Sequence, residues 1–202
     1  MHQDNVIDKF ELKRQIFHLL LGIATIILLS YNIINAWIIF IILLAGIIVS
    51  LLSKNFKIPV VYWLLNQFER EAEFKKFPGK GSMFFCAGVL LTIMLFPQDI
   101  AFASIIILAL GDSVSHLFGM YVGRTKGIFG SKTKTIEDSI AGIFVAFLGA
   151  LFFVIWYEAL LAAVVAMIAE AVELDMNKHR VDDNIIVPLA AGTSLYVLRM
   201  FI

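Results

Sequence analysis

The sequence predicts an all-α integral membrane protein, with about seven transmembrane helices and one amphipathic helix at the membrane surface. Hydrophobic residues make up 60% of the 202 residues, and the mean hydropathy is +0.90. Charged residues make up only 16%, whereas soluble domains carry about 25%. The apolar residues form segments long enough to cross a bilayer, and the basic residues gather in every second connection.

Each apolar segment approaches the length of about 20 residues that a helical crossing of the bilayer needs. The predicted spans are residues 16–31, 34–53, 82–97, 100–122, 138–157, 159–174 and 184–201. Together they form a single membrane domain over residues 1–202. The single cysteine, Cys86, lies inside an apolar run, and we interpret it as a packing residue.

Basic residues indicate the orientation of these spans. They precede the first span and fill the connections at about 54–81, 123–137 and 175–183, all on one side of a seven-span protein, and only Arg199 falls on the other side. The positive-inside rule then places the N-terminus in the cytoplasm. We expect a multi-pass protein of a prokaryotic plasma membrane or an endomembrane.

Residues 59–77 predict the amphipathic helix. Apolar side chains recur at helical spacing at Val61, Leu65 and Phe68, and charged residues follow from Glu69 onward. A Pro-Gly-Lys-Gly stretch follows, in which the glycines beside Lys80 allow the backbone to approach an anion closely. This stretch is equally consistent with a simple entry into the next helix.

Asp112 lies in the fourth span, where a carboxylate costs roughly 2.5–3.5 kcal/mol at bilayer depth. A bound cation or a basic partner would offset this cost. Small residues recur every four positions along the same span, at Gly111, Ser115, Gly119 and Gly123. They favour close helix packing, either within the chain or in a homodimer. His116 is one turn from Asp112, and a packing or supporting role suits it better than metal ligation.

A glycine-rich basic loop follows this span and carries Arg124, Lys132 and Lys134. A hard-metal ligand beside such a loop is typical of phosphate chemistry. Thr135 can cap the next helix, with Glu137 in its first turn. Capping accounts for the acidic residues but not for the lysines.

Further acidic groups, Glu170, Asp182 and Asp183, stand where they could meet Asp112 on one side of the membrane. All are oxygen ligands, so Mg²⁺ or another divalent cation is expected rather than zinc. Glu11, Arg14 and His18 share one helical face that could reach the same site. A snorkelling ion pair with a packed histidine is the alternative for that face.

Taken together, these elements resemble the CTP-dependent lipid kinase family, which includes dolichol kinase, phytol kinase and the yeast-type diacylglycerol kinase. The elements that carry the resemblance occur in the same order over most of the chain: Glu11, Arg14 and His18; Pro78-Gly79-Lys80-Gly81; Gly111-Asp112-Ser113 with Gly119, Gly123 and Arg124; residues 134–139 with Gly142; and Glu170 with Asp182-Asp183-Asn184 and Pro188. The chain departs from the family at Gln15, where many members have a basic residue, and at Asp138, where glycine is frequent.

The resemblance implies transfer of a phosphoryl group from CTP to a membrane lipid alcohol at the cytoplasmic face, with no nucleic acid partner. Four kinds of site residue follow from it: catalytic residues Asp112, Lys134, Glu170 and Asp183; nucleotide-binding residues Lys80, Gly111, Ser113, Gly119, Gly123, Arg124, Lys132, Lys134, Glu137 and Ser139; metal ligands Asp112, Glu170, Asp182 and Asp183; and substrate-binding residues Glu11, Arg14, His18, His116 and Asn184.

Two other classes of function stay open. The cytidylyltransferases that make CDP-lipids share part of the nucleotide-site pattern, but their C-terminal Asp-Arg-x-x-x-Asp signature is absent here. A small proton- or cation-coupled transporter would also carry intramembrane acids and a histidine. Because the charged groups gather on the predicted cytoplasmic side, the sequence favours an enzyme over a transport path.

Overall fold

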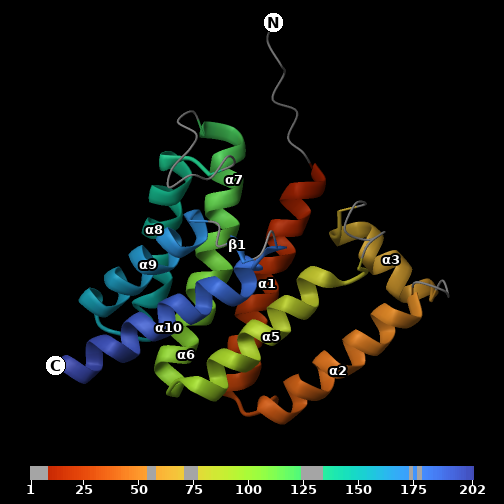
Figure 1. Cartoon of the computed structure of the whole chain (residues 1–202), viewed down its shortest axis with the longest axis horizontal. Helices are drawn as coiled ribbons and strands as arrows, with labels where there is room; N and C mark the ends of the chain where they lie inside the picture. The colour runs from red at the N-terminus through yellow and green to blue at the C-terminus, as the bar shows by residue number, and fades with distance from the viewer. Residues whose placement is uncertain (1–8, 54–57, 71–76, 124–133, 173–174, 177–178) are drawn as a thin grey trace, which may run out of the picture.

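The structure, a computed structural model, describes residues 9–53, 58–70, 77–123, 134–172, 175–176 and 179–202. These residues are almost entirely helical (Figure 1). The helices are α1 (Lys9–Ser30), α2 (Ala36–Ser53), α3 (Pro59–Phe68), α5 (Lys80–Leu95), α6 (Gln98–Ile107), the π-helical turn η1 (Leu108–Asp112), α7 (Ser113–Val122), α8 (Ile136–Ala150), α9 (Trp156–Ala171) and α10 (Asp183–Phe201). A hairpin of two-residue strands, β1 (Asp175–Met176) and β2 (His179–Arg180), precedes α10.

Among the described residues, four helical segments are long and apolar enough to cross a membrane: α1, α2, the continuous rod from Gln98 to Val122, and α10. The predicted all-helical class is therefore confirmed, and the predicted count of seven spans is not. Helix α5 is a shorter apolar helix. Helices α8 and α9 have 15 and 16 residues, which is short of the length of about 20 residues that spans a bilayer.

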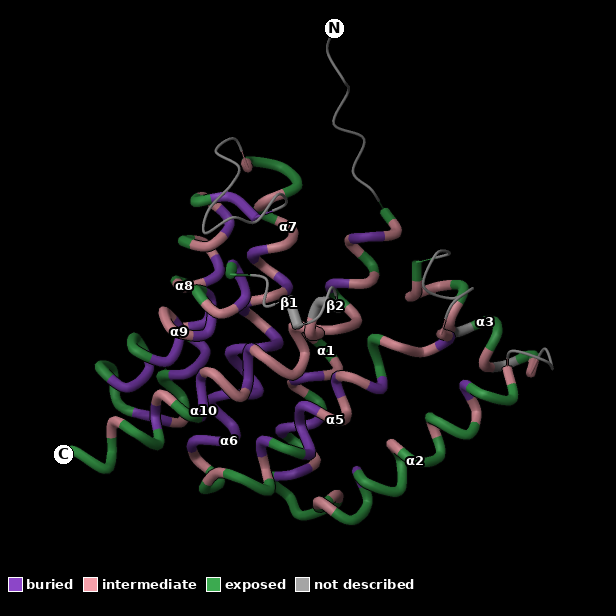
Figure 2. The backbone as a smooth tube through the Cα atoms, viewed as in Figure 1, coloured by how far each residue is buried: buried purple, intermediate pink, exposed green. Residues whose placement is uncertain are grey.

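Burial is concentrated in one part of the fold (Figure 2). Helix α6 lies in the centre and packs against α1, α5, α8, α9 and α10. Large apolar side chains are exposed on the outer helices, including Trp37, Ile41, Met94 and Phe144. A water-soluble monomer rarely exposes so extensive an apolar surface, whereas a membrane-embedded protein presents one to lipid.

The fourth predicted span contains a π-helical turn, Leu108–Asp112, between α6 and α7. Such turns are rare and occur often at functional sites, because the inserted residue changes which side chains face a cleft. Asp112 is the last residue of this turn. No proline or other helix breaker marks the turn in the sequence, whose residues are Leu-Ala-Leu-Gly-Asp.

The small residues of this span pack inside the chain rather than at a free surface. A Cβ added at Gly119 would lie 2.7 Å from Oδ2 of Asp138 on α8, and one added at Gly142 on α8 would lie 2.9 Å from Cβ of Ser115. The two helices therefore approach closely only because these positions are glycine. The four-residue stripe serves an intramolecular contact, so it no longer argues for a homodimer.

The predicted amphipathic helix is shorter than expected. Helix α3 has proline in its first turn, as predicted, but it ends at Phe68 and not at residue 77. The carboxylate of Glu69 instead accepts hydrogen bonds from the backbone N–H groups of Gly79 (2.8 Å) and Lys80 (3.0 Å). Gly79 has a positive φ of 78°, which glycine adopts at little cost, so the chain turns there into α5.

Candidate functional site

The largest concentration of polar side chains surrounds a cavity of about 660 Å³. It opens where α1, α5, α7, α8 and α10 meet. Its lining includes charged or polar residues from all of these helices: Arg14, Gln15, Arg70, Lys80, Asp112, His116, Lys134, Thr135, Asp138, Asp182, Asp183 and Asn184. We call it the polar pocket.

Three helices begin at the polar pocket. Lys80 and Gly81 are the first residues of α5, Thr135 is the N-cap of α8, and Asp182 is the N-cap of α10. Helix N-termini carry a positive partial charge that favours phosphate groups. Side chains already accept from some of the first N–H groups: Glu69 at α5, Thr135 at α8 and Asp182 at α10. The capping prediction for Thr135 is confirmed, because its hydroxyl accepts from the N–H of Asp138 while the Asp138 carboxylate accepts from the N–H of Thr135.

Positive side chains also face the polar pocket. Nζ of Lys80 lies 3.5 Å from Oδ2 of Asp182. This ion pair joins the start of α5 to the start of α10, and 39% of the Lys80 side chain is exposed. An exposed pair of this kind contributes little stability, so the lysine can turn to an incoming phosphate at low cost.

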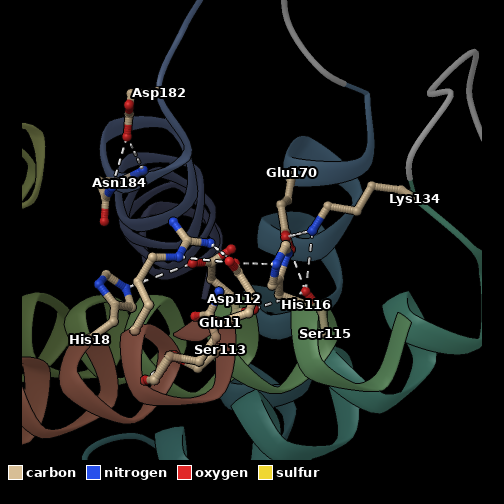
Figure 3. A network of polar contacts seen from close by, with 12 residues as sticks. Glu11, His18, Asp112, Ser113, Ser115, His116, Lys134, Glu170, Asp182 and Asn184 are labelled. Atoms are coloured by element: carbon tan, nitrogen blue, oxygen red, sulfur yellow. Dashed lines mark hydrogen bonds and ion pairs between the residues drawn. The ribbon is translucent and has the colours of Figure 1, made fainter. Parts of the chain in front are cut away.

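Lys134 is held differently. Its ammonium group forms an ion pair with Glu170 and lies 3.3 Å from the hydroxyl oxygen of Ser115. The Ser115 hydroxyl also donates to Oε1 of Glu170 at 3.0 Å. Glu170 is 2% exposed and is not part of the pocket lining. The cost of the buried carboxylate is thus offset by a lysine, while Lys134 still lines the pocket (Figure 3).

Glu11 joins three positive or polar groups from different parts of the chain. Its Oε1 accepts from Nε of Arg14 (2.9 Å) and from Nη2 of Arg70 (2.9 Å), and it lies 2.7 Å from Nε2 of His116. Arg14, Arg70 and His116 all line the polar pocket. Glu11 therefore fixes the orientation of two guanidinium groups at the pocket wall. Its contact with Arg14 is the ion pair that the sequence offered for this helical face.

A second pocket, of about 270 Å³, adjoins the first between α1, α3 and α5. Its walls are mainly apolar. The apolar side chains that line it are Phe17, Leu21, Val61, Leu65, Phe68 and Phe85. Phe17 of α1 stacks on Phe68 of α3 with ring centroids 4.3 Å apart. Five residues line both cavities: Arg14, Gln15, Gly81, Asp112 and Asn184. We call this second cavity the apolar pocket.

The structure brings most of the predicted site residues to these two pockets. Those that line one or both are Arg14, His18, Lys80, Asp112, His116, Gly119, Gly123, Lys134, Asp182, Asp183 and Asn184. Arg124 and Lys132 lie outside the described residues.

Several other predicted site residues lie behind the pocket walls. Gly111 packs against Met167, and the Ser113 hydroxyl donates to the backbone oxygen of Gln15 at 3.3 Å. The Ser139 hydroxyl donates to the backbone oxygen of Thr135. Glu137, although in the first turn of α8, is not part of either lining. Gly111, Ser113 and Ser139 therefore support the pocket walls through packing and hydrogen bonds to the backbone.

Several described residues that line the pockets were not predicted as site residues, among them the polar residues Arg70, Gln15 and Asp138. Arg70 follows α3 and reaches Glu11 across the fold, a contact for which the sequence carries no signal. Gln15 was noted only as a departure from the resembled family, and Asp138 as a departure within the matching residues 134–139, yet both are buried at the pocket. Their places in the sequence could have indicated a site role. Gln15 directly follows Arg14, and Asp138 lies three residues after Thr135. Polar groups buried next to such residues usually have a hydrogen-bond partner.

The donor set fits a magnesium ion that arrives with a nucleotide. No cluster of three or more His, Cys, Asp or Glu side chains suited to a metal occurs in the part of the chain that the structure describes. Magnesium, however, is usually held by one or two carboxylates together with substrate phosphates. Asp112, Asp182 and Asp183 line the polar pocket and offer such carboxylates, whereas Glu170 is engaged by Lys134.

Comparison with known proteins gives a relative but no activity. The uncharacterized protein MJ1137 of Methanocaldococcus jannaschii is 30% identical over 182 residues, which cover 88% of this chain and 88% of that protein. No family model matches the chain. No solved structure is similar to it.

Proposed function

The chain belongs to the same family as protein MJ1137 of Methanocaldococcus jannaschii, and we propose that it is a lipid alcohol kinase. In this proposal it transfers the γ-phosphoryl group of CTP to the hydroxyl group of a membrane lipid such as a polyprenol, dolichol or prenol. The resemblance in motifs suggested this reaction, and the geometry of the two pockets supports it independently of the motifs.

One observation carries the proposal: a charged cavity and an apolar cavity share a wall that contains Asp112 and Asn184. A lipid kinase must hold a polyanionic nucleotide and an apolar chain at once, with their reacting atoms in contact. A soluble-substrate enzyme needs no apolar pocket beside its phosphate site, and a structural membrane protein needs neither.

The polar pocket suits the phosphates of a nucleotide. Three helix N-termini face it, and Arg14, Arg70, Lys80 and Lys134 line it. When Mg²⁺ is bound with the nucleotide, it would supply further positive charge against the phosphate oxygens, held by Asp112 with Asp182 or Asp183. The preference for CTP over ATP rests on the resemblance alone.

The transfer step can be written with named groups. The lipid hydroxyl oxygen forms a bond to the γ-phosphorus, the bond from that phosphorus to the β,γ-bridging oxygen breaks, and CDP leaves. The hydroxyl proton passes to a carboxylate, for which Asp112 and Asp183 are the candidates. Lys80 and Lys134 stabilise the charge that develops on the transferred group and on CDP.

In this proposal the chain crosses the membrane seven times, and α5, α8 and α9 are the shorter crossings. Both pockets lie at the end of the helices to which the basic connections belong, so the positive-inside rule makes this the cytoplasmic end. Helix α3 then lies at the membrane surface beside the apolar pocket. A lipid could enter from the bilayer between α1 and α3 with its hydroxyl at the interface.

A transport function has less support. At the opposite end of the fold, Arg199 pairs with Glu158 (2.6 and 2.8 Å) and with Asp99 (2.6 Å). Between that cluster and the polar pocket, residues 100–109 of the central rod are apolar except Ser104, whose hydroxyl donates to the backbone oxygen of Ile100. No chain of polar side chains joins the two ends along this rod.

The proposal is tested by a transfer assay on purified protein in lipid or detergent with Mg²⁺. CTP and ATP labelled at the γ-position are offered with geranylgeraniol, dolichol and diacylglycerol. Label from γ-CTP in one lipid class is the expected result. Incorporation from α-labelled CTP, without γ-label, would identify a CDP-lipid cytidylyltransferase instead, and the absence of both would refute the proposed reaction.

A further inference from the structure

Two buried polar atoms at the head of the apolar pocket have no hydrogen-bond partner. They are Nε2 of His18 and Oδ1 of Asn184. Among the described residues one other side-chain atom, Oγ of Ser53, is in the same state. Buried polar groups in folded proteins are almost always paired, so two unpaired ones at one place require an explanation.

Both residues line the apolar pocket, and so does Asp112. Nε2 of His18 lies 3.8 Å from Oδ2 of Asp112, beyond hydrogen-bonding distance. The imidazole ring is held edge-on to Phe85, with centroids 5.3 Å apart. Nδ2 of Asn184 donates to Oδ1 of Asp182 at 2.7 Å, so the amide cannot rotate freely. Both unpaired atoms are therefore held in fixed orientations.

Figure 3 shows how these side chains lie. The His18 ring and the Asn184 amide come from helices at opposite ends of the chain, α1 and α10, and the amide oxygen points toward the ring. Asp112 lies beside them, and it also lines the polar pocket. Asn184 and Asp112 therefore lie where the two cavities meet, and Nε2 of His18 is 3.8 Å from Asp112 on the apolar side.

We propose that His18 and Asn184 form a hydroxyl-binding subsite for the lipid alcohol. A hydroxyl group provides one donor and two acceptor lone pairs. It donates to Oδ1 of Asn184 and accepts from the Nε2–H tautomer of His18, which satisfies both atoms at once. The apolar chain then lies along Phe17, Leu21 and Phe85. The inference rests on the proposed lipid substrate and names the residues that position its reacting oxygen.

The chemistry of the subsite selects an alcohol over other membrane headgroups. A phosphate or carboxylate has no proton to donate to the Asn184 oxygen, and it would face the carboxylate of Asp112. A hydrocarbon leaves both polar atoms unpaired. A lipid hydroxyl satisfies them and stands next to Asp112, where a nucleotide in the polar pocket would meet it.

Binding without nucleotide tests the subsite apart from catalysis. The probes are tritiated geranylgeraniol and its methyl ether, which keeps the chain and the oxygen but cannot donate a proton. Wild-type protein is expected to bind the alcohol at least about tenfold more tightly than the ether, the scale of one or two hydrogen bonds. Equal affinities for alcohol and ether would overturn the subsite.

Asn184→Leu is expected to lower that ratio to near one while still binding the chain, because only the alcohol can donate to Oδ1 of Asn184. His18→Phe is expected to weaken the binding of alcohol and ether alike by about tenfold, because the oxygen of either probe accepts from Nε2–H. Asn66→Leu is the matched control, because Asn66 is exposed on α3 and lines neither pocket. A wild-type ratio in Asn184→Leu would overturn the proposal, since another group would then accept the hydroxyl proton. Wild-type affinity for the alcohol in His18→Phe would equally overturn it, since His18 would then make no contact with the oxygen.

Folding is checked by thermal unfolding in the same detergent. His18→Phe removes an unpaired buried nitrogen, so its unfolding temperature is not expected to fall, and this variant keeps the test valid if Asn184→Leu unfolds. The two proposals fail separately. Alcohol selectivity without any label transfer would retain the subsite and refute the kinase reaction. Label transfer without selectivity for the alcohol over the ether would retain the kinase reaction and refute the subsite.

Discussion

Lys134 and Glu170 form an ion pair that is almost wholly enclosed, with 8% and 2% of the two residues exposed. Lys134 stands just before α8 and Glu170 near the end of α9, so the pair joins the start of one helix to the end of the next. The ion pair also explains how a charged carboxylate is accommodated inside the helix bundle, because the lysine compensates its charge. The pair gives Glu170 a structural role, and the metal-ligand role that the sequence suggested for it stays a prediction.

Removing one partner of this pair should destabilise the fold. Glu170→Ala removes the carboxylate that neutralises the buried ammonium group of Lys134, and we expect a loss of about 3–5 kcal/mol in the free energy of unfolding. Thermal or denaturant unfolding in detergent measures it. The double variant Lys134→Met/Glu170→Met should recover much of that stability while remaining inactive, because Lys134 lines the polar pocket.

A variant of Glu170 can also distinguish its ion pair with Lys134 from a role as a Mg²⁺ ligand. In Glu170→Gln, the Mg²⁺ concentration that gives half-maximal activity should stay within about twofold of the wild-type value, because Glu170 does not line the polar pocket. An increase of tenfold or more would support the metal-ligand role.

Asp112 should dominate the chemistry. Asp112→Asn keeps the size of the side chain but removes the charge at the wall shared by the two pockets. We expect turnover to fall more than about 100-fold, the scale of losing a key electrostatic group, with the protein still inserted and folded. The labelled-CTP assay measures it. Asp99→Asn, at the opposite end of the fold, is the control and should keep near-normal turnover; a similar loss in both variants would argue against a specific role.

Glu11 should control nucleotide binding through the arginines it holds. Without its carboxylate, Arg14 and Arg70 lose the acceptor that fixes them at the pocket wall. Glu11→Ala is expected to raise the KM for the nucleotide by about tenfold and to change kcat much less, the pattern of lost ground-state binding.

The matched control for Glu11 is Glu158→Ala. Glu158 is also buried and also holds an arginine, Arg199, but far from both pockets. It should lower thermal stability and leave KM unchanged. If both variants changed KM equally, the effect would be a general consequence of destabilisation.

The close contact of α7 with α8 should not tolerate even one methyl group. In Gly142→Ala the new Cβ would lie 2.5 Å from Sδ of Met167 and 2.9 Å from Cβ of Ser115. Overpacking of this kind costs about 1–3 kcal/mol. Gly46→Ala is the control, since its Cβ would meet only Met83 at an ordinary 3.5 Å. Equal unfolding temperatures for the two variants would contradict the packing.

The proposed seven crossings can be tested by labelling. The single natural cysteine is first replaced, as Cys86→Ser, and single cysteines are then placed at Gln98 and Ile202 or at Lys13 and Lys80. We expect a membrane-impermeant maleimide to label the first two from outside intact cells and the second two only after lysis. Labelling of Ile202→Cys only after lysis would require an even number of spans.

Much of the fold was predictable because the membrane imposes a simple rule. A bilayer offers no partners for backbone N–H and C=O groups, so long apolar runs must be helices, and their positions follow from composition. The rod from Gln98 to Val122 and helix α10 illustrate this. Helix α3 shows the limit of the rule, because its end at Phe68 depends on Glu69 capping another helix.

By itself, the sequence determined the helical class, the end of the molecule where the charges gather, and the chemical types available there: carboxylates, lysines and glycines. Only the tertiary structure decided which of them meet. Glu170 and Asp112 look alike as acids in apolar runs, yet one is paired with Lys134 and the other faces two cavities. The physical reason is that a buried charge takes its role from its nearest partner across the fold, and neither the distances between helices nor the π-helical turn that presents Asp112 can be read from residue spacing.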